Sequence, residues 1–352
     1  MARSAAANSP FLQELNMSDD QHPIFITNGY QINTMPTTAL ANFIVTNISQ
    51  GHHGCSAHGG GGLGKTTAQQ YLTDNASRWL VGSNKQPIGV AARMVMPSGT
   101  RRSDRAFWGA MNNRLRISTA LRVEPSVALE RLRNYIRTRC GQAKVRRMVL
   151  FIDNAQRITD TEYQYLEDLD GQLTDDQLSL FLVLVRQSDA EGVDIGDDWL
   201  ERPSHTVRRW FMDTMPFQPL MGLREIAHAL SRYDKAVTWP TPDMSFSRYF
   251  ARTAFDAGWT LASDAGLLLS EMQALRKAFH LPESEAWPMA TFTLVVHYLL
   301  SEVAAREPSF KGFTAAQVKN ALLTTGYLRL EFVRARLPLP ESLRGQPMPE
   351  AA

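Results

Sequence analysis

The chain has 352 residues and a formal net charge of +2; 44% of its residues are hydrophobic and 20% are charged. This length suits a core domain of about 200 to 250 residues with a smaller second domain. The longest apolar stretches fall far short of the ~20 residues that a membrane span needs. No signal-peptide pattern opens the sequence, so we expect a cytoplasmic protein without membrane contact. Its two cysteines, Cys55 and Cys140, are expected to be buried, reduced thiols.

The first expected elements lie ahead of a run of glycines. Residues 1–36 are expected to form a loosely structured N-terminal extension, and residues 37–49 a helix. Residues 53–58 stand where a strand should lead into the glycines. They are small and polar, whereas branched apolar residues are usual in a strand. We therefore expect this first strand to be short or distorted.

The glycine run fits the phosphate-binding loop pattern G-x-x-x-x-G-K-[ST]. Its residues, followed by Thr67, are Gly59, Gly60, Gly61, Gly62, Leu63, Gly64, Lys65 and Thr66. Such a loop turns backbone N–H groups toward a phosphate, its lysine adds a positive charge near the β and γ phosphates, and its threonine hydroxyl binds Mg²⁺. Residues 65–72 are expected to form a helix whose N-terminus faces the anion. The pattern predicts binding of ATP with Mg²⁺; the alternative is a flexible glycine linker.

The segment after this helix is strongly basic, and the one after that is strongly acidic. Residues 88–96 are expected to form a strand, followed by helices from Ser103 to Arg116 and from Ser126 onward. Residues 93–147 hold fourteen basic and three acidic side chains, whereas residues 153–201 hold fourteen acidic and two basic ones. Two interpretations remain open. The charges balance one another on solvated faces of one fold, or the basic block faces nucleic acid and the acidic block faces a neighbouring subunit.

A second nucleotide motif is predicted at Asp153. Residues 148–152 form a continuous apolar strand that ends in this carboxylate, which is placed to hold the water shell of Mg²⁺. Asn154 follows where a glutamate is common. An amide cannot act as a base, so either hydrolysis is slow or the attacking water is positioned from elsewhere. A role of Asn154 in capping the following turn is compatible with both outcomes. A helix over 159–173 and a buried strand over 178–185 complete the alternation that is typical of a parallel α/β sheet with crossover helices.

The C-terminal third is expected to be helical. After the break at 239–242, residues 245–257, 262–279, 287–305 and 315–326 are expected to form helices. The expected domains are the extension 1–36, a nucleotide-binding α/β domain 37–235, a helical lid domain 236–336 and a Pro-rich C-terminal tail 337–352.

Several later segments resemble one family, the AAA+ ATPases that regulate DNA transposition (the TnsC, TniB and MuB group). Residues 150–158 are similar to the group's second nucleotide motif, which usually ends D-E-A-Q. Residues 163–173 and 180–187 are similar to its following helix and strand. Residues 207–212, leading into 217–220, are similar to the arginine-containing segment before the last core strand. The resemblance covers residues 37–234.

The resemblance implies a fold and roles for further residues. The fold is a P-loop NTPase of AAA+ type, with a parallel β-sheet flanked by helices and a C-terminal all-helical lid. Gln187 takes the place of the residue that senses the γ-phosphate. Either Arg208 or Arg209 would complete the ATP site of the next subunit, unless they are only a surface pair. The residues implied in DNA contact are Arg101, Arg102 and Arg105.

The function implied is that of an ATPase that controls transposition. The protein would oligomerise on double-stranded DNA as a ring or helical filament, select target DNA, and recruit a transposase or a target-selection protein. Lys65 and Asp153 would carry nucleotide chemistry, with Asn154 slowing it. Two alternatives stay open: a DNA-independent signalling ATPase that acts through protein partners, and a scaffold that binds ATP without hydrolysing it.

Overall fold

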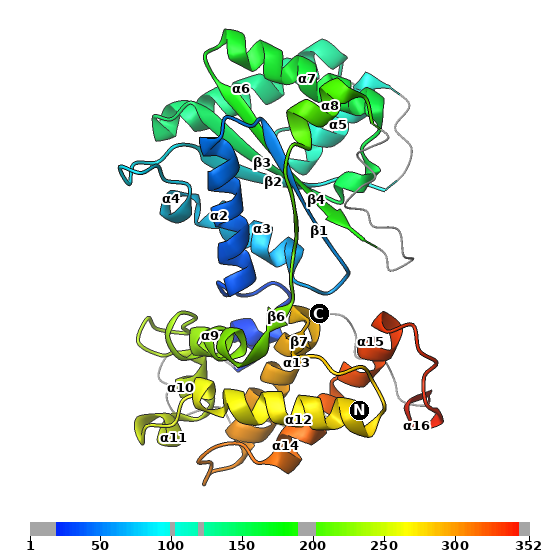
Figure 1. Cartoon of the computed structure of the whole chain (residues 1–352). Helices are drawn as coiled ribbons and strands as arrows, with labels where there is room; N and C mark the ends of the chain where they lie inside the picture. Colours follow the sequence, from blue (N-terminus) through cyan, green and yellow to red (C-terminus); the bar gives the residue numbers. More distant parts are fainter. Residues whose placement is uncertain (1–18, 99–102, 119–122, 189–201, 345–352) are drawn as a thin grey trace. The chain divides into compact units, whose positions relative to one another are not determined.

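The computed structural model describes residues 19–98, 103–118, 123–188 and 202–344. They form two compact units, an α/β unit of Pro36–Gln218 and a mostly helical unit of Met1–Met35 with Pro219–Ala352 (Figure 1). Each unit is described by itself below. Within the described ranges, no helix combines the length and the hydropathy that crossing a bilayer would require.

The α/β unit alternates strands and helices in the expected order. Its elements are α2 (Met35–Ser49), β1 (Gly54–Gly59), α3 (Lys65–Asp74), α4 (Ala76–Trp79), β2 (Val90–Val95), α5 (Asp104–Arg114), α6 (Pro125–Ala143), β3 (Arg147–Asp153), the 3-10 turn η3 (Ala155–Arg157), α7 (Asp160–Asp175), β4 (Ser179–Gln187), α8 (Ser204–Trp210) and β5 (Thr214–Pro216). The strands form one five-stranded sheet in the order β2-β3-β4-β1-β5, and every pair in it is parallel. The predicted parallel α/β sheet is confirmed.

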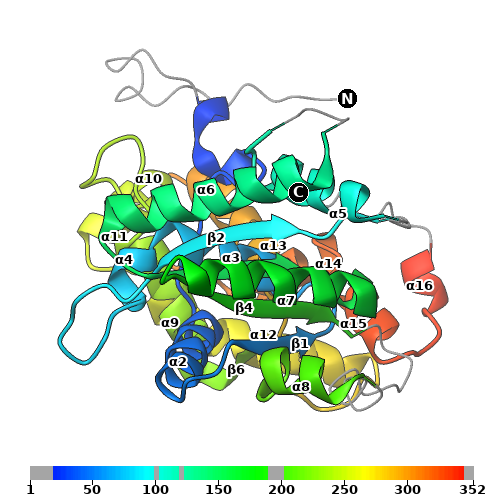
Figure 2. The same ribbon diagram turned by 90° about the horizontal axis from the view of Figure 1, so that it is seen from above.

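Helices cover both faces of this sheet because its inner strands are apolar on both sides. In β3, Met148, Leu150 and Ile152 pack in a core with α5, α6, α7 and α8, whereas Val149 and Phe151 pack in a second core with α2 and α3. Alternate residues of a strand point to opposite faces, so a continuous apolar run builds two cores at once. Figure 2 shows α6 beside the edge strand β2 and α7 beside β4.

The first strand is regular, which corrects the expectation of a short or distorted one. β1 spans six residues and pairs with β4 on one side and β5 on the other. Its small residues are explained by close neighbours. A Cβ on Gly54 would lie 2.9 Å from the carbonyl oxygen of Leu182 and 3.2 Å from the Trp210 ring. A branched side chain has no room there, so this central strand must be built from small residues.

The cysteines follow the prediction. Cys55 in β1 and Cys140 in α6 are both free and buried. Burial raises the pKa of the Cys55 thiol well above its usual value and that of Cys140 to about 11. Both are therefore neutral, unreactive thiols at physiological pH.

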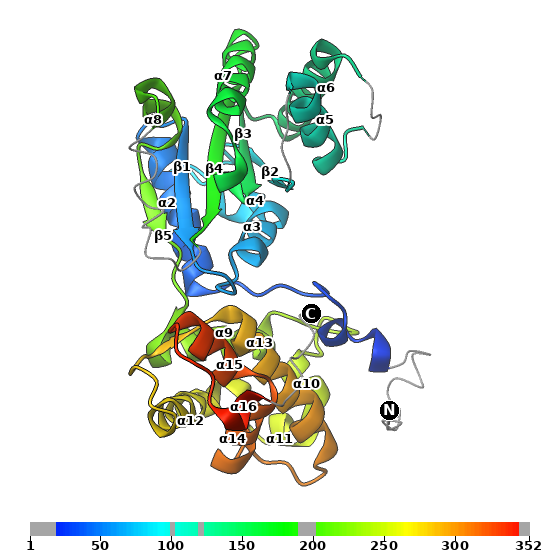
Figure 3. The same ribbon diagram turned by 90° about the vertical axis from the view of Figure 1, so that its right-hand side faces the viewer.

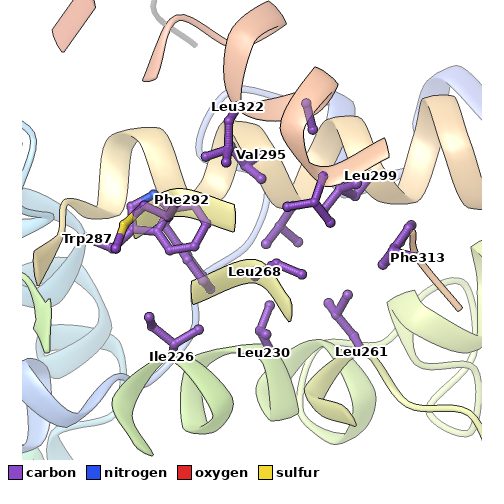
Figure 4. Packing of buried hydrophobic residues seen from close by; sticks show 14 of the residues in the cluster. Ile226, Leu230, Leu261, Leu268, Trp287, Phe292, Val295, Leu299, Phe313 and Leu322 are labelled. Atoms are coloured by element: carbon purple, nitrogen blue, oxygen red, sulfur yellow. The ribbon is translucent and has the colours of Figure 1, made fainter. Parts of the chain in front are cut away.

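The helical unit surrounds a single large core. Its elements are the 3-10 turns η1 (Asp19–Gln21) and η2 (Pro23–Phe25), β6 (Leu220–Met221), α9 (Gly222–Lys235), α10 (Phe246–Phe250), α11 (Arg252–Asp256), η5 (Leu261–Asp264), α12 (Ala265–Ala278), β7 (Ala286–Trp287), α13 (Met289–Tyr298), the π turn η6 (Leu299–Val303), η7 (Ala304–Arg306), α14 (Ala315–Thr324), α15 (Tyr327–Arg334) and α16 (Glu341–Arg344). In Figure 4, Ile226 and Leu230 of α9 face Leu268 of α12, with Trp287 and Phe292 beside them. The short antiparallel pair β6–β7 was not expected from the sequence.

The expected boundary after residue 36 lies within one residue of the one in the structure, whereas the expected divisions at 235 and 336 do not separate the two units. The helix α9 belongs to the helical unit because its apolar face, including Tyr233, lies in that unit's core. Ile24 and Ile32 pack into the same core, so the described part of the expected extension is structured. The expected tail also contributes, because the carbonyl oxygen of Leu343 accepts hydrogen bonds from Arg329 at 3.1 and 2.6 Å. The boundary in the structure lies at 218/219.

Two histidines contact the N-terminal segment in this core, His22 fully buried and His297 partly buried. His22 is fully buried among the rings of Trp239, Phe246 and other aromatic residues, and its Nδ1 accepts a hydrogen bond from the Ile24 N–H. His297 Nε2 contacts the Tyr30 hydroxyl. Burial lowers the pKa of His22 to about 3, with a smaller contribution from His297, and burial lowers that of His297 to about 4.

We expect acid to destabilise the helical unit well above the range where carboxylates titrate. Both pKa values are depressed below 6.5, so between pH 6.5 and pH 4 the unfolded chain binds more protons than the folded chain. Stability is therefore full above pH 6.5 and is lost as pH falls. At pH 5 each histidine lowers the free energy of unfolding by about 2 kcal/mol relative to its value at high pH. Urea unfolding at pH 7 and pH 5, followed for wild type and His22→Gln, measures this loss. A wild-type loss no larger than that of the variant would contradict the prediction.

Candidate nucleotide site

The glycine loop lies between the carboxyl end of β1 and the start of α3. Gly62 and Gly64 have φ angles of 74° and 92°, a left-handed conformation that side chains disfavour. At Gly60 an added Cβ would meet nothing within 4 Å. The loop is thus a bare backbone cradle at the positive end of a ten-residue helix, which is the arrangement that binds phosphate.

Lys65 is folded onto this loop. Its ammonium Nζ donates hydrogen bonds to the carbonyl oxygens of Gly59 at 2.7 Å and Gly60 at 2.6 Å. The residue is almost completely buried, and a buried ammonium needs such partners. Its charge therefore stands at the mouth of the cradle, beside the place that a phosphate would take.

Thr66 and Asp153 meet below the loop. The Thr66 hydroxyl donates a hydrogen bond of 2.6 Å to Oδ2 of Asp153, and the backbone N–H of Asn154 donates to Oδ1 at 3.0 Å. Asp153 is buried and ends β3, at the same edge of the sheet where β1 gives way to the glycine loop. A hydroxyl and a carboxylate side by side are the hard oxygen ligands that Mg²⁺ prefers. These residues fit an ATP–Mg²⁺ complex.

Asn154 has an unusual backbone. Its φ and ψ are 57° and 38°, the left-handed region in which asparagine is enriched and glutamate is strained. It precedes η3, but its side chain makes no capping hydrogen bond. Asn154 thus stands at the N-cap position of η3 without using its side chain to cap the turn. The backbone gives a physical reason for an asparagine where a glutamate is common.

Gln187 reaches the glycine loop from β4. It is paired in register with Gly59, and a Cβ on Gly61 would lie 3.4 Å from the Gln187 side-chain nitrogen. Its backbone N–H donates to the side-chain oxygen of Gln156 at 3.2 Å. The structure thus brings Gln187 beside the phosphate cradle, as the sequence resemblance implied.

Two residues near the site were not singled out from the sequence. Gln156 fixes the backbone of Gln187; it is the glutamine of the D-E-A-Q pattern, although no role was assigned to it from the sequence. Arg93 of β2 donates from Nη1 to the carbonyl oxygen of Thr66 at 3.2 Å. An arginine inside an otherwise apolar strand was the available signal, because such a cation needs a nearby polar partner.

The strand order and the placement of the two motifs define the fold. The glycine loop follows a central strand, and the carboxylate ends β3, with β4 between the two strands. This is a P-loop NTPase fold of AAA+ type.

The chain is distantly similar in structure to several solved proteins. No family model matches the sequence, and no curated protein does. The ORC2 protein of Aeropyrum pernix in its ADP form is 12% identical over 89% of this chain and 87% of that one, with a TM-score of 0.41. Cdc6p of Pyrobaculum aerophilum is 16% identical over 79% and 70%, with a TM-score of 0.38. A point variant of Thermotoga maritima RuvB is 13% identical over 84% and 70%, with a TM-score of 0.39.

The two candidate trans arginines lie at the opposite end of β1 from the loop. They belong to α8, whose Trp210 packs at Gly54, the first residue of the strand. A strand of six residues spans roughly 17 Å, so neither arginine reaches the glycine loop of its own chain. Arg209 is engaged, with Nε 3.7 Å from Asp170 Oδ2. Arg208 is exposed and makes no hydrogen bond or ion pair with a described residue.

Of the three arginines implied in DNA contact, only Arg105 lies among the described residues. Arg101 and Arg102 lie outside the described residues. Arg105 is half exposed and donates a hydrogen bond of 2.6 Å to Glu124 Oε1. Its charge is therefore already balanced inside the chain.

Proposed function

We propose that this protein is an ATP-dependent AAA+ ATPase that assembles on duplex DNA in the cytoplasm and regulates transposition. The observation that carries its nucleotide chemistry is the contact between Thr66 and Asp153 directly below a glycine cradle that holds Lys65. The transposition role is supported by the sequence resemblance alone. In that role the ATP-bound oligomer would select target DNA and recruit a transposase or a target-selection protein.

Each residue of the candidate site has its own proposed role in binding ATP and Mg²⁺. The loop N–H groups and Lys65 would bind the triphosphate, while Thr66 and Asp153 would hold Mg²⁺. The metal ion would neutralise charge on the phosphate oxygens. Gln187 would contact the terminal phosphate, because its amide lies beside Gly61. Arg208 is the better of the two candidates for completing a neighbouring subunit's site, since Arg209 is paired with Asp170.

Electron microscopy tests this proposal directly. The purified protein is imaged with duplex DNA and a slowly hydrolysed ATP analogue, beside a nucleotide-free control. Nucleotide-dependent rings or filaments on DNA are the expected result. Particles that bind nucleotide but ignore DNA would instead support a signalling or scaffold ATPase that acts through protein partners.

Replacing Asn154 with glutamate should speed ATP hydrolysis. The new carboxylate can act as a general base, a contribution of at least about 10-fold even in imperfect geometry. The left-handed backbone opposes this change, so we also expect a loss of about 1 kcal/mol in stability. Phosphate release and urea unfolding measure the two effects. Asn154→Gly, which suits the same backbone but carries no base, is the matched control, and a glutamate variant no faster than wild type would rule out the idea.

A further inference from the structure

A group of unbalanced arginines lies where α5 ends alongside α6. Arg114 is the last residue of α5, Arg116 follows it, and Arg131 projects from α6. Arg131 Nη1 donates to the Ser118 hydroxyl at 2.9 Å, which brings the α6 arginine to the turn that holds Arg116. All three arginines are exposed. We name Arg114, Arg116 and Arg131 the α5–α6 basic surface; Figure 3 shows the two helices side by side.

The acidic residues of the basic block are used elsewhere. Glu124 binds Arg105, and Glu130 binds Arg133 at 2.9 Å and Arg137 at 3.1 Å. Asp104 accepts the backbone N–H of Arg105. Across the described part of the chain, no carboxylate lies within ion-pair distance of the α5–α6 basic surface. Among the described residues, the three positive charges are therefore left to water or to an added anion.

The acidic block of a second copy is a poor candidate for that partner. Its described carboxylates are largely occupied within the chain. Asp176 binds Arg133 at 3.0 Å and Arg137 at 2.7 Å, Asp160 binds Arg202 at 2.7 Å, and Asp170 binds His53 at 3.0 Å. Among the described acids of that block, Asp160, Asp170 and Asp176 are balanced internally, whereas these arginines have no described counter-ion. An anion that carries its own uncompensated negative charge suits them better.

The basic surface is held in place by backbone hydrogen bonds. The N–H of Arg116 donates to the Asn113 carbonyl oxygen at 3.0 Å, and that of Ile117 donates to Asn112 at 2.8 Å. Arg116 has a φ of 57°, which turns its side chain outward while Ile117 packs against the core. An arginine whose backbone is already ordered loses less conformational entropy when it binds a ligand.

We propose that Arg114, Arg116 and Arg131 contact the phosphates of duplex DNA. This inference rests on the proposed function, and it assigns the contact to residues other than Arg101, Arg102 and Arg105. Each of these exposed guanidinium groups can bind a phosphate with paired N–H donors. Contacts to the backbone give binding that depends on salt and tolerates any base sequence.

The test measures DNA affinity as a function of salt. A fluorescent duplex of random sequence is titrated with protein and a slowly hydrolysed ATP analogue, and anisotropy is recorded at several salt concentrations. The variant carries Arg114→Gln, Arg116→Gln and Arg131→Gln. We expect at least about 10-fold weaker binding and a slope of log K against log salt that is smaller by about 2 to 3. Unchanged binding of a fluorescent ATP analogue shows that the variant is folded.

A matched variant removes the same charge elsewhere in the α/β unit. Arg78→Gln, Lys144→Gln and Arg146→Gln replace three exposed cations away from the basic surface, and this variant should bind DNA nearly as wild type does. Equal losses in both variants, or none in the first, would overturn the assignment and leave DNA assembly standing. Impaired self-association of the first variant without DNA would overturn it in favour of a subunit contact. Wild-type protein that binds no DNA would refute the proposed function itself.

Discussion

Replacing Lys65 with alanine is expected to weaken ATP binding by about 100-fold and to abolish nucleotide-dependent assembly. The ammonium lies within hydrogen-bond distance of two loop carbonyls, so it is already placed at the cradle. Each charge-assisted hydrogen bond contributes about 1.5 to 3 kcal/mol, and two lost phosphate contacts amount to about 100-fold in affinity. Titration with a fluorescent ATP analogue measures the first effect, and electron microscopy with DNA measures the second.

Lys319→Ala supplies the control for this variant. Lys319 is an exposed lysine on α14, where alanine suits the helix, so its replacement removes the same charge without touching the loop. Both variants should remain folded. Normal rings or filaments formed by Lys65→Ala would sink the proposed mechanism, because assembly would then not depend on this nucleotide site.

Replacing Asp153 with asparagine is expected to reduce Mg²⁺-dependent ATP hydrolysis by about 100-fold or more. The change keeps the shape of the side chain but removes the charge that would hold the metal ion. Loss of one preorganised electrostatic group costs about 3 kcal/mol in the transition state. The amide can still accept from the Asn154 N–H and can donate to the Thr66 hydroxyl, so the variant should keep its local hydrogen bonds and lose mainly the charge. Phosphate release across a range of Mg²⁺ concentrations measures the effect.

The control here is Asp168→Asn, an exposed carboxylate on α7. It should leave turnover unchanged. The metal dependence separates a role in catalysis from one in folding, since a merely structural residue would lower activity at every Mg²⁺ concentration without shifting the midpoint. An Asp153→Asn protein with the wild-type midpoint and rate would show that the carboxylate does not hold the metal.

Local patterns predicted the elements that carry the candidate nucleotide site, because each of these elements depends on a short stretch of sequence. The glycine loop, its helix and the strand ending in Asp153 each depend on a short stretch, and the parallel sheet brings their ends together. Two helix starts also depend on local sequence: the Ser103 hydroxyl accepts the Ala106 N–H, and Thr159 and Glu162 form a capping box. These features need no knowledge of distant contacts.

The features that the sequence concealed depend on residues far apart in the chain. The glycine at position 54 in β1 is explained by its close contact with Trp210, which lies more than 150 residues later in the chain. The pairing of Arg133 and Arg137 with Asp176 decides which arginines stay exposed, and charge counts alone cannot show it. The helix expected over 245–257 is interrupted at Ala251, whose φ of −135° ends α10. Tertiary packing overrides local preference at each of these places.

The helical unit contains residues that precede the α/β unit in the sequence and residues that follow it. It therefore cannot fold until the C-terminal part of the chain has been synthesised. Residues 19–35 leave the ribosome about 180 residues before the first of their partners, at Pro219, which is roughly 10 to 40 s at the usual elongation rates. During that time Ile24, Ile32 and His22 have no core to join, because partners of His22 such as Trp239 and Phe246 have not yet been made. The nucleotide-binding unit can complete its sheet first, whereas the early segment must be shielded from aggregation until the last third of the chain has been made.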